Sequence, residues 1–369
     1  MSQLDLVIKK INKQFGEDIA SNGVVIRQFD RIQFSSPRIN YMTYGGIPRG
    51  RLIEFGGDEG SGKTTTALDI CANAQKVFEK EFDELEDKKD KQPKKVVFCD
   101  CENTLDEEWA RKLGVDVDNM LLLRPMQQTA EQIFEMLIQI METGEVGLII
   151  LDSLGVLVSQ QAYDKTMEEK TMGGIAAPLT LFSKKAIPLC SRYDCTLIAI
   201  NQVREDMAGF GRYITIGGKA WQHNCSLRLA FKKGDFIDGA GNVIKRSSES
   251  PAGNQVQVAI VKNKVSNSDR RNGFYTLNYN YGVDKISDTV DLAILFGIIQ
   301  KGGSWFSIID TETGEIMQNE VYTSYDETGS PDYEKEDLKF QGKPSLLDYL
   351  RNNEDIFNKI NEQVLEKLG

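Results

Sequence analysis

A run of eight residues, Gly57 to Thr64, has the residue types and the spacing of a phosphate-binding loop. A glycine is followed by four residues and then by Gly-Lys-Thr, and the run lies between the apolar stretch LIEF (52–55) and a helical pattern. In such a loop backbone N–H groups surround phosphate oxygens, the next helix presents its positive end, and the lysine reaches the outer phosphates. The expected nucleotide contacts are Gly57, Asp58, Glu59, Gly60, Ser61, Gly62, Lys63, Thr64 and Thr65.

Two carboxylates follow apolar runs in positions that suit the chemistry of a bound triphosphate. Asp152 ends the run VGLIIL (146–151), so we expect it at the carboxyl end of a buried strand, where ligands bind in parallel sheets. With the hydroxyl of Thr64 it is the predicted Mg²⁺ ligand. Glu102 lies just beyond the run VVFC (96–99) and is the candidate general base that orients an attacking water.

The elements that would position these residues alternate between short β-rich runs and helical patterns. This alternation predicts an α/β fold with a mostly parallel central sheet flanked by helices. A charged stretch at 79–95 and a polar stretch at 310–337 are expected outside the core. The strand candidates are LIEF (52–55), VVFC (96–99), VGLIIL (146–151), TLIAI (196–200) and QVQVAIV (255–261).

Each end of the chain carries an apolar stripe at helical spacing. Near the start the stripe precedes a short strand-like run at 24–26, and near the end it recurs every four residues. The first helix could pack on its own domain or on a neighbouring subunit, and the pattern alone leaves both open. The stripes are Leu4, Val7, Ile8, Ile11 and Phe15, and Ile356, Ile360, Val364 and Leu368.

The net charge of the chain is unfavourable for nucleic-acid binding, but it describes the average surface and not a particular site. The formal net charge is −11, whereas phosphate contacts require positive charge locally, and a cleft can carry the opposite sign from the rest of the surface. Basic pairs occur at 184–185, 232–233 and 270–271. No apolar run approaches the roughly 20 residues that cross a bilayer, so we expect a cytoplasmic protein without a membrane partner.

Read in order from the phosphate loop, five segments resemble those of the RecA family of recombinases. They are FCDCENTLDEEWARKLGVDVDNMLL, VGLIILDSLGVLV, TLIAINQVRE, AIVKNKV and GGSWFS. The resemblance implies an N-terminal polymerisation helix and strand (1–34), a RecA-like ATPase core (35–283), and a small α+β C-terminal domain (284–369). It also implies that ATP and Mg²⁺ are cofactors and that helical filaments form on single-stranded DNA and pair it with double-stranded DNA.

The resemblance assigns roles around the nucleotide. It implies that Asp106 and Trp109 lie against the adenine, and Trp109 stands where the family usually has tyrosine, so an aromatic plane is kept. Tyr281 corresponds to a second aromatic residue near the base. Gln202 matches a sensor of the terminal phosphate, whose amide could couple nucleotide state to DNA affinity.

Two lysines match residues that act across the filament interface. Lys262 and Lys264, in VKNK, resemble lysines that reach the ATP held by the adjacent subunit. Their charge would stabilise the transition state as an arginine finger does, which would make hydrolysis depend on assembly.

DNA contacts are implied in two loops, at about 164–178 and 203–219. Two methionines there align with apolar side chains that wedge between base triplets, and two glycines permit close approach of the backbone to phosphate. The expected DNA-binding residues are Met172, Gly173, Lys184, Lys185, Arg204, Met207, Phe210, Gly217, Gly218, Lys232 and Lys233.

The chain departs from the family at several DNA-contacting positions. Pro178 replaces an arginine, while Gln257 and Ala259 replace basic residues on the strand that receives duplex DNA.

Two functions other than a recombinase remain open for this sequence. One is a hexameric helicase, which would form closed rings, and the other is a regulatory ATP switch that binds proteins and no DNA. Electron micrographs would identify rings, and an absence of DNA binding at low salt would favour the switch.

Overall fold

The computed structural model describes residues 2–15, 30–89, 91–166, 174–205, 213–239, 242–245, 250–267, 269–311, 313–325 and 331–368. The chain divides into two compact units, Met1–Asp30 and Arg31–Gly369. The described part of the first unit is the helix α1 (Gln3–Phe15), which confirms the helix expected from the N-terminal stripe. The expected strand at 24–26 lies outside the described residues.

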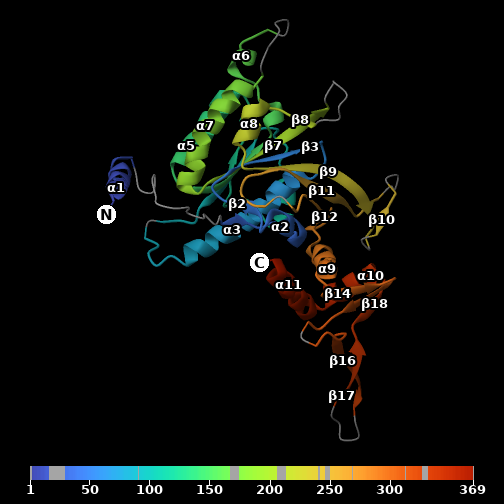
Figure 1. Cartoon of the computed structure of the whole chain (residues 1–369). Coiled ribbons are helices and arrows are strands. Elements are labelled where there is room, and N and C mark those ends of the chain that lie inside the picture. Colours follow the sequence, from blue (N-terminus) through green and yellow to red (C-terminus); the bar gives the residue numbers. More distant parts are fainter. Residues whose placement is uncertain are drawn as a thin grey trace. The chain divides into compact units, whose positions relative to one another are not determined.

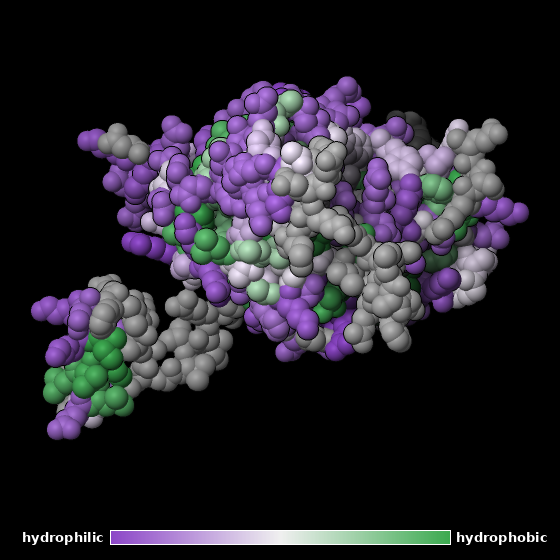
Figure 2. Space-filling model, turned by 90° about the horizontal axis from the view of Figure 1, so that it is seen from above, coloured by the Kyte–Doolittle hydropathy of each residue, from purple (hydrophilic) through white to green (hydrophobic). Residues whose placement is uncertain are grey.

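Within its own unit, helix α1 leaves an apolar face exposed. The exposed fraction is 62% for Leu4 and 51% for Val7, two residues of this face. These side chains belong to the hydrophobic patch, coloured green, that Figure 2 shows on the N-terminal unit. Burial of such a face against another surface is favourable.

The second unit is built on one large sheet. Its strand order is β13-β12-β11-β9-β3-β7-β6-β4-β5, with β10 beside β9 and β8 beside β7. The six strands from β9 to β5 are parallel, whereas β11, β12 and β13 continue the sheet in antiparallel order. The mostly parallel sheet predicted from the alternating pattern is therefore confirmed. The strands are β3 (Leu52–Gly57), β4 (Lys95–Asp100), β5 (Leu121–Leu123), β6 (Val146–Asp152), β7 (Thr196–Glu205), β8 (Tyr213–Thr215), β9 (Leu227–Ile237), β10 (Val243–Ile244), β11 (Gly253–Asn263), β12 (Asn272–Asn278) and β13 (Gly282–Val283).

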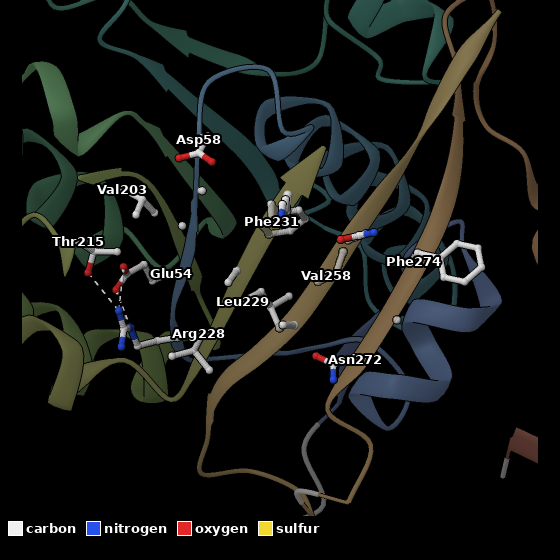
Figure 3. Close-up of a pocket in the computed structure, with 18 of the residues that line it drawn as sticks. Glu54, Asp58, Val203, Thr215, Arg228, Leu229, Phe231, Val258, Asn272 and Phe274 are labelled. Atoms are coloured by element: carbon white, nitrogen blue, oxygen red, sulfur yellow. Dashed lines mark hydrogen bonds and ion pairs between the residues drawn. The ribbon is translucent and has the colours of Figure 1, made fainter. Parts of the chain in front are cut away.

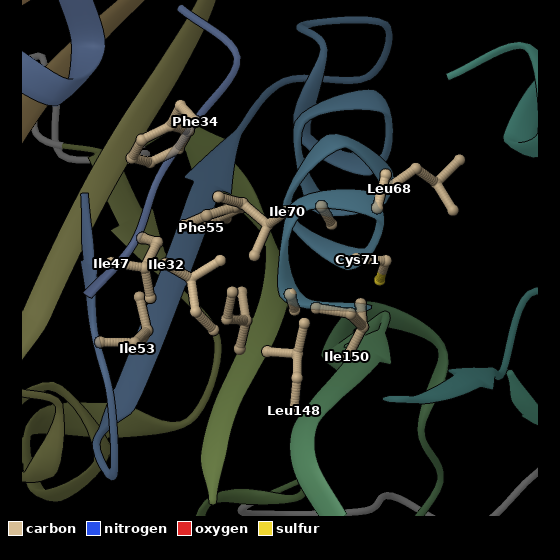
Figure 4. Packing of buried hydrophobic residues seen from close by; sticks show 14 of the residues in the cluster. Ile32, Phe34, Ile47, Ile53, Phe55, Leu68, Ile70, Cys71, Leu148 and Ile150 are labelled. Atoms are coloured by element: carbon tan, nitrogen blue, oxygen red, sulfur yellow. The ribbon is translucent and has the colours of Figure 1, made fainter. Parts of the chain in front are cut away.

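Helices cover both faces of the parallel strands. Helix α3 (Lys63–Asp83) lies on one face, and α5 (Ala130–Glu142) and α7 (Ala176–Tyr193) pack together on the other (Figure 1). Figure 4 shows Leu68, Ile70 and Cys71 of α3 among strand residues such as Phe55 and Ile150. Each fully buried aliphatic or aromatic side chain stabilises the fold by roughly 1.5–3 kcal/mol, so this packing holds the end of β3 and the start of α3 in place.

Shorter elements connect these layers. Helix α2 begins at Pro37, directly after Ser36, whose hydroxyl accepts a hydrogen bond from the Ile39 N–H. No helix in the described ranges is both long and apolar enough to cross a bilayer. The connecting elements are β1 (Arg31–Ile32), α2 (Pro37–Thr43), β2 (Ile47–Pro48), α4 (Glu107–Lys112), the 3₁₀ helix η1 (Leu154–Val156), α6 (Gln160–Tyr163) and α8 (Gly218–Asn224).

The C-terminal segment has a hydrophobic cluster of its own, and it is also bonded to the core. Ser36 donates a hydrogen bond to Asp288, and Arg38 forms an ion pair with Asp291 at 2.7 Å. The predicted domain boundary at residue 283 therefore stays a prediction. The elements are α9 (Lys285–Leu295), β14 (Ile299–Gly302), β15 (Trp305–Ile308), β16 (Gln318–Tyr325), β17 (Pro331–Asp337), β18 (Lys339–Gln341), α10 (Lys343–Asn352) and α11 (Glu354–Leu368).

The polar stretch at 310–337 contains a two-stranded antiparallel hairpin. Strands β16 and β17 pair with each other and belong to no larger sheet within the described residues (Figure 1). Their hydrogen bonds are thus local, which allows a polar sequence to form strands without a buried face of the central sheet.

Candidate nucleotide site

The phosphate loop joins the carboxyl end of β3 to the first turn of α3. Gly62 precedes the helix with φ +93°, a left-handed conformation that favours glycine, and an added Cβ would lie 3.0 Å from Val256 Cγ2. Lys63 Nζ donates to the Asp58 carbonyl oxygen at 2.6 Å, and Ser61 Oγ donates to the same oxygen at 2.7 Å. The loop is thus held in shape by its own side chains.

Two opposing effects act on the pKa of the Lys63 amine: burial and the charges of acidic neighbours. It is only 8% exposed, and burial lowers the pKa of its amine below the ordinary value. The carboxylates of Asp152 and Glu102 act in the opposite direction. A phosphate beside Lys63 would further favour the charged amine, so the site suits an anionic ligand.

The residues expected to bind Mg²⁺ contact each other directly. Thr64 Oγ1 donates to Asp152 Oδ2 at 2.8 Å, and Asp152 lies level with Asp100 on the neighbouring strand. Burial, together with the charges of Glu102 and Asp100, raises the pKa of Asp152 to about 6. Divalent metal would relieve this accumulation of negative charge, and hard oxygen donors suit Mg²⁺.

The donor set also fits a metal that keeps water and phosphate ligands. Among the described residues, no three His, Cys, Asp or Glu side chains converge on one point. Mg²⁺ is usually held by one or two protein oxygens together with substrate phosphates. Thr64 and Asp152 supply that number.

Glu102 lies close enough to Lys63 and Asp152 for its charge to act on both, and a hydrogen bond orients its carboxylate. Ser153, buried and adjacent to Asp152, donates a hydrogen bond from Oγ to the Glu102 carboxylate. Asp100 has a different task, since its carboxylate accepts from the Thr104 and Leu105 N–H groups at 3.2 and 3.0 Å. Ser153 is a site residue that sequence reasoning missed, because a serine after a strand reads equally well as a helix cap.

A hollow of about 420 Å³ extends from the phosphate loop to Trp109. Trp109 belongs to α4, where the Asp106 carboxylate accepts from the Trp109 N–H at 3.0 Å and so caps the helix. The hollow is thus open to a nucleotide whose phosphates lie on the loop and whose base lies at the indole. It is lined by Gly60, Ser61, Gly62, Lys63, Thr64, Thr65, Trp109, Lys233, Asn254, Leu277 and Tyr279.

The second aromatic residue of this hollow is Tyr279. Its hydroxyl donates to Asn254 Oδ1 at 2.8 Å. Tyr281 lines a separate hollow of about 570 Å³ with Arg351, and its hydroxyl donates to Asp284 at 3.3 Å. The structure therefore does not bring Tyr281 together with Trp109, and its predicted contact with the base stays a prediction.

Gln202 lies at the level of the phosphate loop because of strand register. On β7 it is paired with Gly57 of β3, and an added Cβ on Gly155 would lie 2.8 Å from Gln202 Cδ. The side chain is exposed. Strand pairing thus brings the predicted sensor beside the first glycine of the loop.

Lys262 and Lys264 both donate to the end of helix α8. Lys262 Nζ lies 2.5 Å from the Gln222 carbonyl oxygen and 2.7 Å from that of His223, and Lys264 Nζ lies 2.7 Å from the latter. Burial and the neighbouring Lys264 lower the pKa of Lys262 to about 8. In the single chain these lysines are therefore engaged by the last carbonyls of a helix, where cations are favourable.

The predicted DNA-binding residues are only partly described. Met172, Gly173, Met207 and Phe210 lie outside the described residues, as does the side chain of Arg204. The base of the second predicted loop is formed by paired strands, β7 and β8, with Val203 opposite Thr215. The DNA contacts of these residues stay predictions.

The glycines and lysines of the DNA prediction occupy varied surroundings. At Gly217, with φ +104°, an added Cβ would lie 2.4 Å from Leu179 Cδ2, so packing also requires glycine there, and Gly218 begins α8. Lys184 and Lys185 are exposed on α7, and Lys185 pairs with Glu135 at 3.4 Å. Lys233 lines the nucleotide hollow, with Nζ 4.7 Å from the centre of the Phe236 ring.

A larger hollow of about 740 Å³ lies along strands β3, β9, β11 and β12 (Figure 3). Lys232, Gln257 and Ala259 line it. At one end the Arg228 guanidinium is bonded to the Glu54 carboxylate and to Thr215, as the dashed lines in Figure 3 show. The strand expected to receive duplex DNA thus lines an open hollow whose charged residues are Glu54, Asp58, Arg228 and Lys232.

The fold and this site define a protein with a phosphate-binding loop at the edge of a mostly parallel sheet. Comparison with known proteins narrows this class: the family model described as the RecA N-terminal domain matches residues 2–284. The chain belongs to the RecA family. As a member of this family it is an ATP-dependent DNA recombinase.

Curated relatives match along nearly the whole chain. Protein RecA of Chloroherpeton thalassium is 30% identical over 375 residues, which cover 100% of this chain and 90% of the relative. Protein RecA of Acidothermus cellulolyticus is 32% identical over 327 residues, covering 88% and 80%. Protein RecA of Streptomyces ambofaciens is 30% identical over 376 residues, covering 99% and 86%.

Proposed function

We propose that this chain is a DNA-dependent ATPase that uses ATP and Mg²⁺, forms helical filaments on single-stranded DNA, and pairs that strand with double-stranded DNA. The observation that carries the proposal is the hydrogen bond from Thr64 to Asp152 beside the phosphate loop. A hydroxyl and a carboxylate in contact beside such a loop would suit the outer phosphates and their metal, which supports the proposal. Family membership supports the DNA part of the proposal.

In this proposal the phosphate loop performs the binding. Lys63 exchanges the Asp58 carbonyl for phosphate oxygens, and Thr64 and Asp152 hold Mg²⁺, which neutralises charge on the outer phosphates when bound. Trp109 stacks on the base at the other end of the hollow.

Glu102 then acts as the base for hydrolysis. Its carboxylate orients the attacking water and receives a proton from it, while Ser153 holds the carboxylate in position. Lys262 and Lys264 leave the α8 carbonyls and reach the phosphates held by the adjacent subunit. Their charge offsets the charge that develops in the transition state, so hydrolysis depends on assembly.

The test combines ATP hydrolysis, with and without single-stranded DNA, and negative-stain imaging. We expect DNA-stimulated hydrolysis and helical filaments. Lys63→Ala should abolish nucleotide binding, whereas Glu102→Gln should assemble on DNA and stop turnover. Closed rings alone would indicate a helicase, and an absence of DNA binding at low salt would indicate a regulatory switch.

A further inference from the structure

A buried carboxylate outside the nucleotide site collects hydrogen bonds from three separate elements. Glu54, on β3, is 1% exposed. It accepts from Trp221 Nε1 of α8 at 2.9 Å, from Arg228 Nε of β9 at 2.9 Å, and from Asn201 Nδ2 of β7 at 3.4 Å. A buried charge is tolerated only when it is paired and hydrogen-bonded, so these three donors belong to one arrangement.

The same arrangement holds the end of the second predicted DNA loop. Arg228 Nη2 donates to Thr215 Oγ1 at 3.0 Å, and Figure 3 shows Thr215, Glu54 and Arg228 facing one another. Asn201 is bonded twice to Ile216: its amide donates to the carbonyl oxygen at 2.8 Å, and its Oδ1 accepts from the Ile216 N–H at 3.3 Å. The chain that leaves the loop is thus hydrogen-bonded to β9 through Arg228 and to β7 through Asn201.

The residues that bond to Glu54 are also close, in sequence or in the same helix, to the groups proposed to act on the triphosphate. Glu54 lies three residues before Gly57, and Asn201 directly precedes the sensor Gln202. Trp221 is fully buried in α8, the helix whose last carbonyls accept from Lys262 and Lys264. A shift of α8 would therefore move the acceptors of both lysines.

We infer that Glu54 and Trp221 are positioning residues that couple DNA in the second loop to the paired lysines through α8. DNA that binds the loop displaces Thr215 and Ile216. The hydrogen bonds transmit this displacement to Glu54 and Trp221, and the resulting shift of α8 releases the lysines toward the neighbouring subunit. The inference rests on the proposed function, because it needs a chain whose ATP hydrolysis responds to DNA. Neither Glu54 nor Trp221 lines the nucleotide hollow.

The first test is Trp221→Phe, which keeps an aromatic ring in the buried position and removes the N–H donor to Glu54. We expect stimulation of ATP hydrolysis by single-stranded DNA to fall about tenfold, the loss that corresponds to about 1.4 kcal/mol of coupling. The hydrolysis rate without DNA and the KM for ATP should stay unchanged, because Trp221 lies outside the nucleotide hollow. A merely structural role would lower both rates together.

Trp305→Phe is the matched control, since Trp305 lies on β15 of the C-terminal segment and is 42% exposed.

Thr215→Val is the second variant, and it alters the hydrogen bonds at the end of the loop. It removes the oxygen that accepts from Arg228 while keeping the shape of the side chain. We expect the same loss of stimulation, and the double variant should lose little more than either single one.

The outcomes separate the two proposals. If the unaltered protein hydrolyses ATP at the same rate with and without DNA, the proposed function and this inference both fail. If the unaltered protein is stimulated and Trp221→Phe and Thr215→Val are stimulated equally well, the proposed function stands and this inference fails. If Trp221→Phe does not fold, Thr215→Val decides alone.

Discussion

Asp288 offers a direct test of how the C-terminal segment is joined to the core. Its side chain is fully buried, accepts a hydrogen bond from Ser36 at the start of α2, and lies in the first turn of α9. Burial is the main cause that raises the pKa of Asp288 to about 7, and the nearby Arg38 charge opposes it. An unfolded aspartate has a pKa of about 3.9.

The sign of the pH dependence follows from this difference. The folded protein holds the proton more tightly, so the stability that Asp288 contributes is fully present below about pH 3.9 and is lost as the pH rises toward 7. Between pH 5 and pH 8 the loss is about 2.5 kcal/mol, since each pH unit below the folded pKa counts about 1.4 kcal/mol.

Asp288→Asn removes this titration and keeps an oxygen that can accept from Ser36. Relative to the unaltered protein, the variant should gain about 2.5 kcal/mol in free energy of unfolding between pH 5 and pH 8. Urea unfolding at both pH values, with equal m-values, measures the difference. Asp348→Asn, on the exposed side of α10, controls for the loss of one carboxylate. An Asp288→Asn difference that is the same at both pH values would refute the reasoning.

Three further substitutions test the site and the loop. Trp109→Ala should weaken ATP binding roughly 5- to 150-fold, the range of base stacking on an aromatic ring. Tyr281→Phe should bind ATP normally because Tyr281 lines a different hollow, and equilibrium nucleotide binding distinguishes the two variants. Thr64→Val should raise the Mg²⁺ concentration needed for half-maximal hydrolysis, which a Mg²⁺ titration at saturating ATP would show, and an unchanged midpoint would remove Thr64 from the metal site. Gly217→Ala should lower the free energy of unfolding by more than about 2 kcal/mol, because positive φ and the Leu179 contact both oppose a Cβ; thermal unfolding that matches the unaltered protein would count against that packing.

The sequence predicted much of the ATPase core because its signals are local. The apolar runs that became β3, β4, β6, β7 and β11 are continuous and bounded by turns, and the glycine-rich loop has a fixed spacing. The charged stretch at 79–95, expected outside the core, begins inside helix α3, which runs on to Asp83 because Lys and Glu are good helix formers on an exposed face.

The remaining features depend on contacts between residues far apart in the chain. Asn254 on β11 and Tyr279, just beyond β12, both line the nucleotide hollow, and the order of these antiparallel strands in the sheet is invisible in the local pattern. Glu54 reads as one polar residue in a short strand, and its three donors come from residues 201, 221 and 228. The hydrogen bond from Lys262 to the Gln222 carbonyl oxygen of α8 likewise joins residues far apart in the chain, so the local pattern could not predict it.

A mixing experiment tests most directly whether ATP lies between Glu102 of one subunit and the lysines of the next. Glu102→Gln and the double variant Lys262→Ala/Lys264→Ala should each be inactive alone with single-stranded DNA. Mixed in equal amounts, they form about one intact interface in four, since each head-to-tail contact draws its two sides independently. We predict recovery of about a quarter of the unaltered rate. A mixture that forms filaments on DNA and stays as inactive as its components would contradict the shared site.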